Sequence, residues 1–466
     1  MIRRSLVQLL SLLVLLGLVA AACGDDGDTA TDTDSTTTAA PDDTDDPGTT
    51  TAAPDDTDDP EYTIRQVPGD YETIQSAVDA AEPGDLVLID EGVYHEAVIV
   101  QTDNIVIRGM DRNGVILDGE HAEGFENGII VFSNGVAIEN LTVRNYTGNG
   151  LFWTGDYGSD VIVDGYRASY VTAHNIGVYG MYAFNAENGQ IDNAYAGASD
   201  DSSFYIGQCN PCNALLYKVE GENSQLGYSG TNSTGTTIAD SWFHDNLIGV
   251  VPNSQDGEEL APNAGTLIVG NLIENNNNPD VPSRNTGFQL GLGSGVVLAG
   301  VTNNIVERNT IVGNNRAGVI AIDWIDAIFA SGNGADYPAM DNIVRDNIIS
   351  GSTLDADILV ALNDVNNGAQ GNCFSGNEIG GGTNPVDAQT VLPCDGPDTA
   401  VLTTLEELIA LFNLESFEPV DYRDVPAPEL DFENMPGDPA TEPPRPAVDA
   451  PMQVDLDALT PPDPTS

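Results

Sequence analysis

Acidic side chains gather in two insertions of the sequence, Asn253–Ala264 and Asp323–Met340. Carboxylates held close together raise one another's pKa, which suits acid–base chemistry, and their oxygens also hold calcium. The catalytic candidates in these insertions are Asp256, Glu258 and Asp323, and the candidate metal ligands are Asp326 and Asp336. The alternative is that these residues form only the solvated rim of an acidic protein.

Aromatic residues crowd the first half of the chain and are candidates for sugar binding. Neighbouring residues of a strand face opposite sides, so one of Phe152 and Trp153 must point outward. The flat apolar face of an outward ring, beside polar groups, can stack on a sugar ring. The candidate substrate-binding residues are Trp153, Tyr182, Tyr205, Gln208, Tyr228, Asn253, Trp324 and Arg284. The alternative is stacking inside the fold, which we expect for Phe184 and Trp242.

The N-terminus has the features of an export signal. Arg3 and Arg4 precede a short apolar run, and small residues stand immediately before Cys23. This arrangement resembles the lipobox of bacterial lipoproteins, which implies that Cys23 is a lipid anchor at the outer face of the cell membrane or the cell surface. The alternative is ordinary cleavage, which leaves Cys23 as a free thiol.

Cysteine and histidine are too few and too scattered to predict a dedicated transition-metal site. The histidines that do not recur at ligand spacing are His95, His121, His174 and His244. An exported protein oxidises its cysteines, and four of the 5 remain when Cys23 is set aside. We favour the disulfides Cys209–Cys212 and Cys373–Cys394, each closing a local loop, over the crossed pairings.

Composition divides the chain into four parts. Residues 24–60 are almost entirely Asp, Thr, Ala, Pro, Gly and Ser, which cannot build a core. The segment from about 420 onward is again rich in Pro, Asp and Ala, after a short helical pattern at Thr403–Phe412. The predicted organisation is a signal peptide at 1–22, a disordered tether at 23–60, one domain at 61–400, and a cap helix with a Pro/Asp-rich tail at 401–466.

The predicted domain is built from a short repeat. One copy contains Ile268, Asn271, Ile273 and Asn276, and later copies begin at Val306 and Val344. Each copy holds a strand-like segment, an Asn or Gly turn and a second apolar strand, without helical periodicity. Asn at the same place in successive copies suits a stacked turn. The pattern predicts an all-β solenoid in which each coil pairs with its neighbours.

A resemblance to a known family agrees with this pattern. The segment from Tyr71 to Ala81, with Thr73-Ile74-Gln75-Ser76-Ala77, is followed by Gly84-Asp85 and by Gly92-Val93-Tyr94. These residues resemble the start of a pectin-lyase-like right-handed, single-stranded parallel β-helix, in which an N-terminal helix caps the first coil. The later copies resemble the repeats of pectate lyases, alginate epimerases and many secreted bacterial proteins.

The resemblance also suggests chemistry. Lyases of this fold remove a proton beside a uronate carboxylate with an Arg or Lys base, and calcium or further basic groups neutralise the developing charge. It implies Lys218, the only lysine, or Arg284 in this role, with calcium as the possible cofactor. The alternative is a surface cation paired with the plentiful acids. The paired-Asp and Gly-His-Gly pattern of polygalacturonases is missing, and so are the downstream motifs of pectin methylesterases, which disfavours both activities.

Net charge excludes one class of partner. Lys and Arg total 14 against 73 Asp and Glu, for a net charge of -59, so nucleic acid binding has little electrostatic support. We expect a monomeric, surface-anchored protein that acts on or binds a polysaccharide or cell-envelope glycan, with lyase, epimerase and glycosidase activities all open. The alternative is a non-catalytic glycan-binding or structural surface module.

Overall fold

The structure, a computed structural model, describes residues 62–156, 161–284, 291–325, 334–353, 356–407, 418–448 and 451–464. The chain divides into two units, Met1–Glu61 and Tyr62–Ser466. Only the second contains described residues, so the predicted signal peptide, Cys23 and the tether lie outside them. Within the described ranges, no helix has the length and apolarity needed to cross a membrane.

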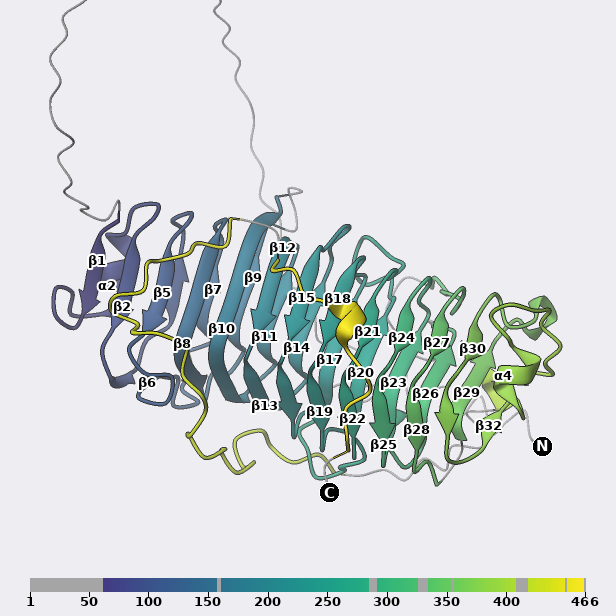
Figure 1. Cartoon of the computed structure of the whole chain (residues 1–466). Helices are drawn as coiled ribbons and strands as arrows, with labels where there is room; N and C mark the ends of the chain where they lie inside the picture. The colour runs from purple at the N-terminus through teal and green to yellow at the C-terminus, as the bar shows by residue number, and fades with distance from the viewer. Residues whose placement is uncertain are drawn as a thin grey trace, which may run out of the picture. The chain divides into compact units, whose positions relative to one another are not determined.

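The second unit is a stack of coils, each made of three short strands that pair in parallel with the strands of the neighbouring coils (Figure 1). The first face contains β1 (Ile64–Val67), β2 (Leu86–Ile89), β5 (Val106–Gly109), β8 (Val136–Arg144), β10 (Val163–Ile176), β12 (Ala186–Asp192), β15 (Ala214–Tyr217), β18 (Thr236–Ala239), β21 (Leu267–Val269), β24 (Ile305–Glu307), β27 (Ile343–Arg345) and β30 (Cys373–Ser375). The second face contains β3 (Gly92–Tyr94), β6 (Val115–Asp118), parts of β8 and β10, β13 (Tyr195–Ser199), β16 (Glu220–Glu222), β19 (Trp242–His244), β22 (Leu272–Glu274), β25 (Thr310–Val312), β28 (Ile348–Ser350) and β31 (Glu378–Ile379). The third face contains β4 (Val98–Val100), β7 (Asn127–Val131), β9 (Asn149–Thr154), β11 (Tyr179–Phe184), β14 (Ser202–Gly207), β17 (Leu226–Thr231), β20 (Ile248–Asn253), β23 (Ser294–Ala299), β26 (Ala317–Ile322), β29 (Ala356–Leu362), β32 (Thr383–Asn384) and β33 (Thr403–Thr404).

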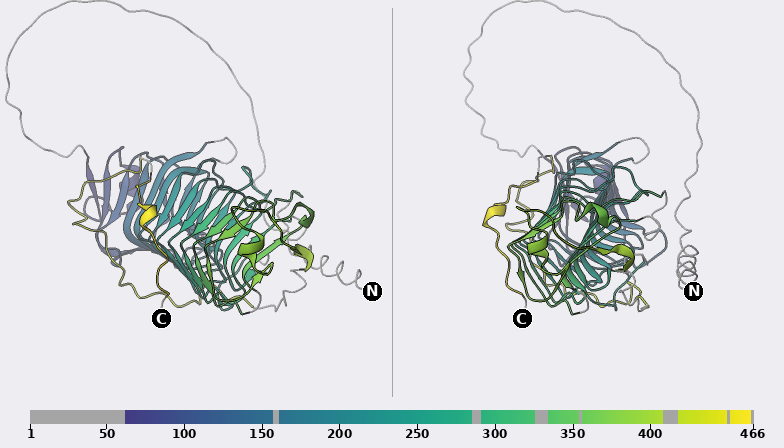
Figure 2. Two further views of the ribbon diagram at one scale, coloured as in Figure 1. Left: turned by 45° about the vertical axis from the view of Figure 1, so that its right-hand side comes forward. Right: turned by 90° about the vertical axis from the view of Figure 1, so that its right-hand side faces the viewer.

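The long strands β8 and β10 continue from the first face onto the second, so these two faces form one 21-stranded sheet, while the third face is a separate 12-stranded sheet. Seen along the stack in the right view of Figure 2, the three faces enclose one interior. The predicted fold class is therefore confirmed. The unit is a parallel β-helix.

Side chains alternate in direction along each strand, and those that point inward fill the interior. Leu151, Met181, Phe204 and Tyr228, from successive coils of the third face, are all fully buried. On the first face, Ile268 lies in register with Val306 of the next coil, and both are fully buried. Because every coil adds apolar side chains at the same positions, one continuous core runs through the stack.

Buried asparagines stack at the turns, as the repeat predicted. Asn271 donates from its backbone N and its Nδ2 to Oδ1 of Asn309, both at 2.9 Å, and Asn309 donates in the same way to Asn347. Asn347 donates to Asn377, whose backbone N donates to Oε1 of Gln389 at 2.7 Å. The stack therefore satisfies the polar groups of each sharp turn inside the protein.

Short helices close both ends. At the N-terminal end, α2 (Ile74–Asp79) begins with a reciprocal capping box between Thr73 and Ser76 and buries Ile74 against the first coils. At the other end, α4 (Ala388–Val391) packs against β30, and η2 (Val365–Asn367) lies in a nearby loop. In the predicted 403–412 helix, residues 405–407 are helical and Leu405 is buried, while residues 408–417 lie outside the described ranges.

The acidic C-terminal tail packs along the outside of the coils (Figure 1, yellow). The side chain of Arg108 is fully buried and its Nη1 donates to the carbonyls of Pro439 and Glu442, at 3.0 and 2.6 Å. Farther along, Nη2 of Arg308 donates to the carbonyl of Leu456 at 2.9 Å, where η3 (Leu456–Ala458) begins. Several of the scarce arginines thus hold this segment in place through its backbone, which composition alone did not suggest.

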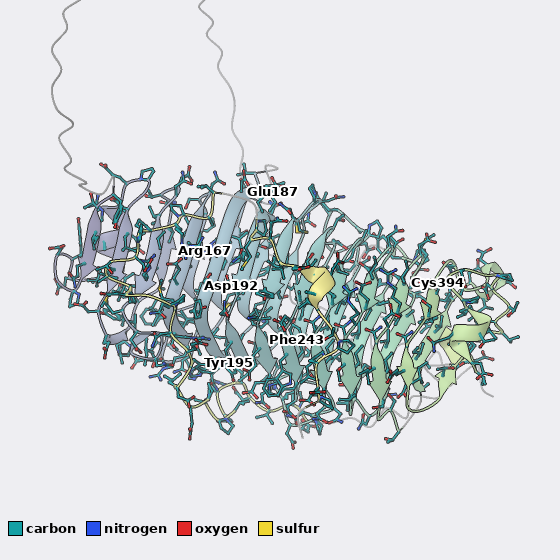
Figure 3. All side chains as sticks on the ribbon, viewed as in Figure 1. Arg167, Glu187, Asp192, Tyr195, Phe243 and Cys394 are labelled. Carbon is teal, nitrogen blue, oxygen red and sulfur yellow. A yellow bond between two sulfur atoms is a disulfide. The ribbon has the colours of Figure 1, made fainter. Side chains whose placement is uncertain are left out.

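Both favoured disulfides are present, Cys209–Cys212 and Cys373–Cys394. The sulfur-bearing side chains of Cys209 and Cys212 are buried beside the third face, and Cys373 begins β30 next to the C-terminal cap. Cys394 lies at that end of the stack in Figure 3. Each bridge closes a local loop, which agrees with a structural role.

Candidate functional site

Four aromatic side chains meet on the outer surface of the third face. Tyr182 of β11 lies in register with Phe152 of β9 on one side and with Tyr205 of β14 on the other. Tyr179, at the start of β11, packs its ring against both tyrosines. We call Phe152, Tyr179, Tyr182 and Tyr205 the aromatic ladder. Neighbouring strands in a sheet lie about 4.8 Å apart, so residues in register on successive coils stack directly.

The rings of the ladder pack mainly against one another. Phe152 and Tyr182 stack with centroids 4.3 Å apart and planes 7° from parallel, and Tyr205 meets Tyr182 edge-on at 4.9 Å. Tyr205 is 3% exposed, while the other three rings are half-buried. A ligand on this surface therefore meets ring edges and tyrosine hydroxyls, rather than a row of open ring faces.

A carboxyl group lies against the ladder. The phenol of Tyr205 donates to Oε1 of Glu258 at 3.0 Å, while Oε2 of Glu258 is buried and has no hydrogen-bond partner among the described residues. Burial raises the pKa of Glu258 to about 7, against the opposing effect of the Tyr205 hydrogen bond. At neutral pH this carboxyl group is therefore present in both protonated and ionised forms, as a proton donor or acceptor requires.

The loop that carries Glu258 is fixed by hydrogen bonds between side chains and backbone groups. Nδ2 of Asn232 donates to the carbonyls of Gln255 and Glu259, at 2.7 and 2.9 Å, and the backbone N of Gln255 donates back to Oδ1 of Asn232 at 3.0 Å. Oδ2 of Asp256 accepts from the backbone N of Ala335 at 2.9 Å, which ties this loop to the next insertion. Glu258 is thus held over the ladder by a folded loop.

A second polar group borders Tyr179. Asp201 is 8% exposed and accepts from the hydroxyl of Ser202 at 2.8 Å, and burial raises its pKa to about 6. Burial also raises the pKa of its neighbour Asp200. Arg284 lies beside them, where its backbone N donates to the carbonyl of Asp200 at 3.0 Å and Nη1 donates to that of Gly177 at 3.2 Å.

The structure brings Tyr182, Tyr205, Glu258 and Arg284 together but not the other predicted sugar-binding aromatics. Trp153 and Tyr228 are fully buried, because they occupy the inward positions of β9 and β17. Trp324 faces the outside of the third face, but a covering loop leaves it only 4% exposed. The burial of Trp153 and Tyr228 inside the coils contradicts contact with a surface ligand, and the assignment of Trp324 stays a prediction.

Two of the predicted polar contacts are also buried and act within the fold. Asn253 is fully buried and accepts from the hydroxyl of Thr231 at 3.1 Å, so it stacks between coils. Gln208 is 2% exposed and follows β14 at a turn. Neither side chain reaches a surface ligand, so both assignments are wrong. Sequence could not separate such buried residues from surface residues, because Asn and Gln serve in both places.

The remaining catalytic and metal candidates are dispersed. Asp323 is 5% exposed and accepts from the backbone N of Ala339 and of Asn363, at 2.8 and 2.7 Å, so it joins two loops. Lys218 lies at the corner between the first and second faces, over the ring of Tyr217, and is not part of the ladder. The structure brings neither residue to the ladder, and both catalytic assignments stay predictions. Asp336 is exposed, and Asp326 lies outside the described residues.

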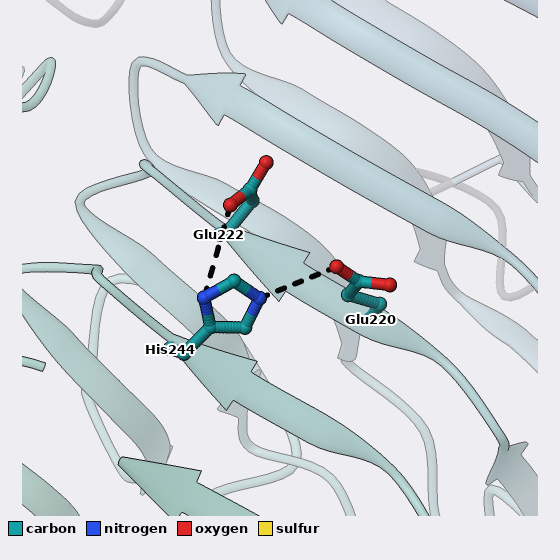
Figure 4. A group of neighbouring side chains, drawn as sticks. All are labelled: Glu220, Glu222 and His244. Atoms are coloured by element: carbon teal, nitrogen blue, oxygen red, sulfur yellow. Dashed lines mark hydrogen bonds and ion pairs between the residues drawn. The ribbon is translucent and has the colours of Figure 1, made fainter. Parts of the chain in front are cut away.

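A histidine cluster on the second face was missed. Glu220 and Glu222 of β16 lie beside His244 of β19, and Figure 4 shows both carboxylates directed at the imidazole. Nδ1 of His244 is 2.8 Å from Asp245 and Nε2 is 3.3 Å from Glu220. A coil step of 22 residues separates positions 222 and 244, so the repeat spacing contained the signal.

This cluster is the one group of three or more potential metal ligands within the described residues, with ligand atoms within 4.8 Å of one another. Burial lowers the pKa of His244, but hydrogen bonds to Asp245 and Glu220 and the charge of Glu222 outweigh burial and raise it to about 9. The imidazole is therefore charged at neutral pH and balances the surrounding carboxylates. Zinc would have to displace that proton to bind.

A cavity lies elsewhere, between the C-terminal tail and the corner of the first and second faces. Its volume is about 380 Å³. Figure 3 shows Arg167 and Asp192, two of its lining residues, on this side of the stack. The tail residues in its wall are Met435, Pro436, Arg445 and Met452. The cavity is separate from the ladder, which is an open surface.

Comparison with known proteins finds only distant structural likeness. No family model and no curated protein matches the sequence. The chain is similar to the A-module of the Azotobacter vinelandii mannuronan C-5 epimerase AlgE4, at 14% identity and a TM-score of 0.46, covering 66% of this chain and 90% of the module. It is also similar to an alginate lyase from Paenibacillus sp. str. FPU-7, at 15% identity and a TM-score of 0.39, covering 59% and 91%. Pectate lyase Pel9A gives 13% identity and a TM-score of 0.35, covering 66% and 72%. Likeness at this level carries no argument about substrate or reaction.

Proposed function

We propose that this protein binds a glycan on the aromatic ladder. The observation that carries the proposal is that Phe152, Tyr179 and Tyr182 are only half-buried on the third face, beside the carboxyl group of Glu258. Aromatic edges offer an apolar surface to sugar C–H groups, while the phenols and the carboxyl group exchange hydrogen bonds with sugar hydroxyls. A site with an apolar floor and a few directed polar groups is typical of carbohydrate recognition.

One observation favours turnover as a second function. Glu258 has a buried oxygen without a partner and a pKa of about 7, so it can give or take a proton at neutral pH. Such a group would protonate a leaving glycosidic oxygen or remove a proton from a sugar carbon. The resemblance to lyases and epimerases suggested calcium and an acidic substrate. Neither is needed for Glu258 to protonate a glycosidic oxygen or to remove a proton from a sugar carbon.

Replacing one ring of the ladder tests binding. We expect Tyr182→Ala to weaken glycan binding by at least about tenfold, because it removes the central ring that contacts three others. The measurement is calorimetric titration of residues 61–466 with soluble polysaccharides. Tyr217→Ala, on the first face, is the matched control and should bind as the unmodified protein does. Equal losses in both variants would refute the ladder as the site.

Replacing the carboxyl group tests turnover. Glu258→Gln keeps the shape of the side chain and removes its proton transfer, so we expect any glycan cleavage or epimerisation to fall by at least about a hundredfold. Mass analysis of products distinguishes a lyase, whose fragments lack the water of hydrolysis, from a hydrolase. Glu259→Gln, an exposed neighbour on the same loop, is the control. Full activity in Glu258→Gln would exclude this residue from the chemistry.

A further inference from the structure

The charged groups around the ladder are mostly acidic. The groups whose charges act on the ladder tyrosines are Glu258 and Asp201, with Arg284 acting on Tyr179 alone. Asp200 adds a further carboxyl group beside Asp201. A negatively charged ligand would therefore meet two or three carboxyl groups at this surface, in a place already partly removed from water, where like charges repel strongly.

Arg284 does not offset this acidity. Its Nη1 donates to the carbonyl of Gly177, and its charge already acts on both Asp200 and Asp201. One guanidinium thus faces two carboxyl groups before any ligand arrives. Bridging by a divalent cation has no prepared place here either, since the ligand group found among the described residues is that of His244, on the second face.

The ionised form of Glu258 also disfavours a uronate carboxylate at this surface. An ionised carboxylate accepts hydrogen bonds but cannot donate one, so it cannot hydrogen-bond to a second carboxylate. One oxygen of Glu258, Oε1, already accepts from the phenol of Tyr205. A sugar unit without a carboxylate avoids this contact between two charged acceptors.

We infer that the sugar units in contact with the ladder are uncharged. This inference rests on the proposed function, because it assigns a ligand class to the same surface. It differs from the uronate expected from family resemblance, and its basis is the charge around the ladder in this chain.

Matched oligosaccharides test the inference. The probes are oligomannuronate, oligoguluronate and oligogalacturonate, each before and after carboxyl reduction, which removes the charge and keeps length and linkage; neutral xylo- and chito-oligosaccharides complete the set. Binding to residues 61–466 is measured at pH 8, where Glu258 is largely ionised. We expect the best neutral probe to bind at least about tenfold more tightly than any uronate, and each bound reduced probe to exceed its parent. In Glu258→Gln, that gap should shrink.

The outcomes separate this inference from the proposed function. A uronate that binds more tightly than its reduced partner, and loses binding in Tyr182→Ala, would overturn the inference and keep the ladder as the site. If no probe binds, or binding is indifferent to Tyr182→Ala, both the inference and the proposed function fail. Tighter neutral binding that Tyr182→Ala abolishes supports both.

Discussion

The outward row of the third face differs between its two halves. Toward the N-terminal end it is open: Ile99 is 48% exposed, and the row continues through Ile130 to Phe152 and Tyr182. Toward the C-terminal end the outward positions are aliphatic and buried, as at Ile320, which is 3% exposed. The strands are alike in both halves, so the covering loops decide whether an outward side chain is part of a core or part of a surface.

In the C-terminal half, the loops cover the outward row by forming a second apolar cluster with it outside the coils. Val251, Val297, Ile320 and Leu359 pack beneath residues contributed by loops, including Trp324 and Leu405. The ladder lies where this cover begins, and Glu258 comes from the loop after β20, beside its edge. The protein thus buries its aliphatic outward row under loops but leaves three aromatic rings at the boundary only half-buried, which is the pattern expected of a binding surface.

The largest expected effect comes from placing a charge in each half of the row. We expect Ile320→Asp to destabilise the fold by about 4 kcal/mol or more, because it buries an unpaired carboxyl group in the covered half. Ile99→Asp, at an equivalent outward position in the open half, should cost less than about 1 kcal/mol. Urea unfolding measures both. Similar losses in the two variants would contradict the distinction between covered and open halves.

A smaller effect on stability is expected at Glu258, which lies at the boundary between the open and the covered half. Burial raises the folded pKa of Glu258 to about 7 from its usual 4.5, so the protonated form stabilises the fold at low pH. That contribution is lost as the pH rises through 7. We expect Glu258→Gln to be more stable than the unmodified protein at pH 8 by about 1–2 kcal/mol, and equally stable near pH 4.

Thermal or urea unfolding across that pH range checks this expectation, with Glu259→Gln as the control. A pH dependence that is unchanged in Glu258→Gln would show that the carboxyl group is not desolvated as described. A stabilising substitution at this position would also indicate that the native carboxyl group is kept for function at the expense of stability.

The repeating part of the molecule could be predicted from sequence because each coil depends on local spacing. Asn271 and Asn309 recur at one turn, and the structure stacks them as expected. The site was harder to predict. Alternation shows that one of Phe152 and Trp153 faces outward, but only the direction in which the chain enters the strand decides which one, and Trp153 points inward.

The contacts made by the loops and by the C-terminal tail could not be predicted from local sequence patterns. Glu258 was identified as a candidate from its insertion, yet its contact with Tyr205 depends on how Asn232 holds the loop. The tail resembled a low-complexity segment, but its carbonyls meet arginines such as Arg108 from coils more than three hundred positions away in the chain. Contacts of this range are set by tertiary structure, so composition could not reveal them.

Oxidative footprinting with a bound glycan tests the central claim most directly. Hydroxyl radicals label exposed aromatic side chains, and mass spectrometry reports the label at each residue with and without ligand. We expect the ligand to protect Phe152, Tyr179 and Tyr182 from labelling. Phe132, which is 49% exposed, and Tyr217 should be labelled equally in both states. Protection of Tyr217 or of the His244 cluster, with the ladder labelled as before, would contradict this expectation.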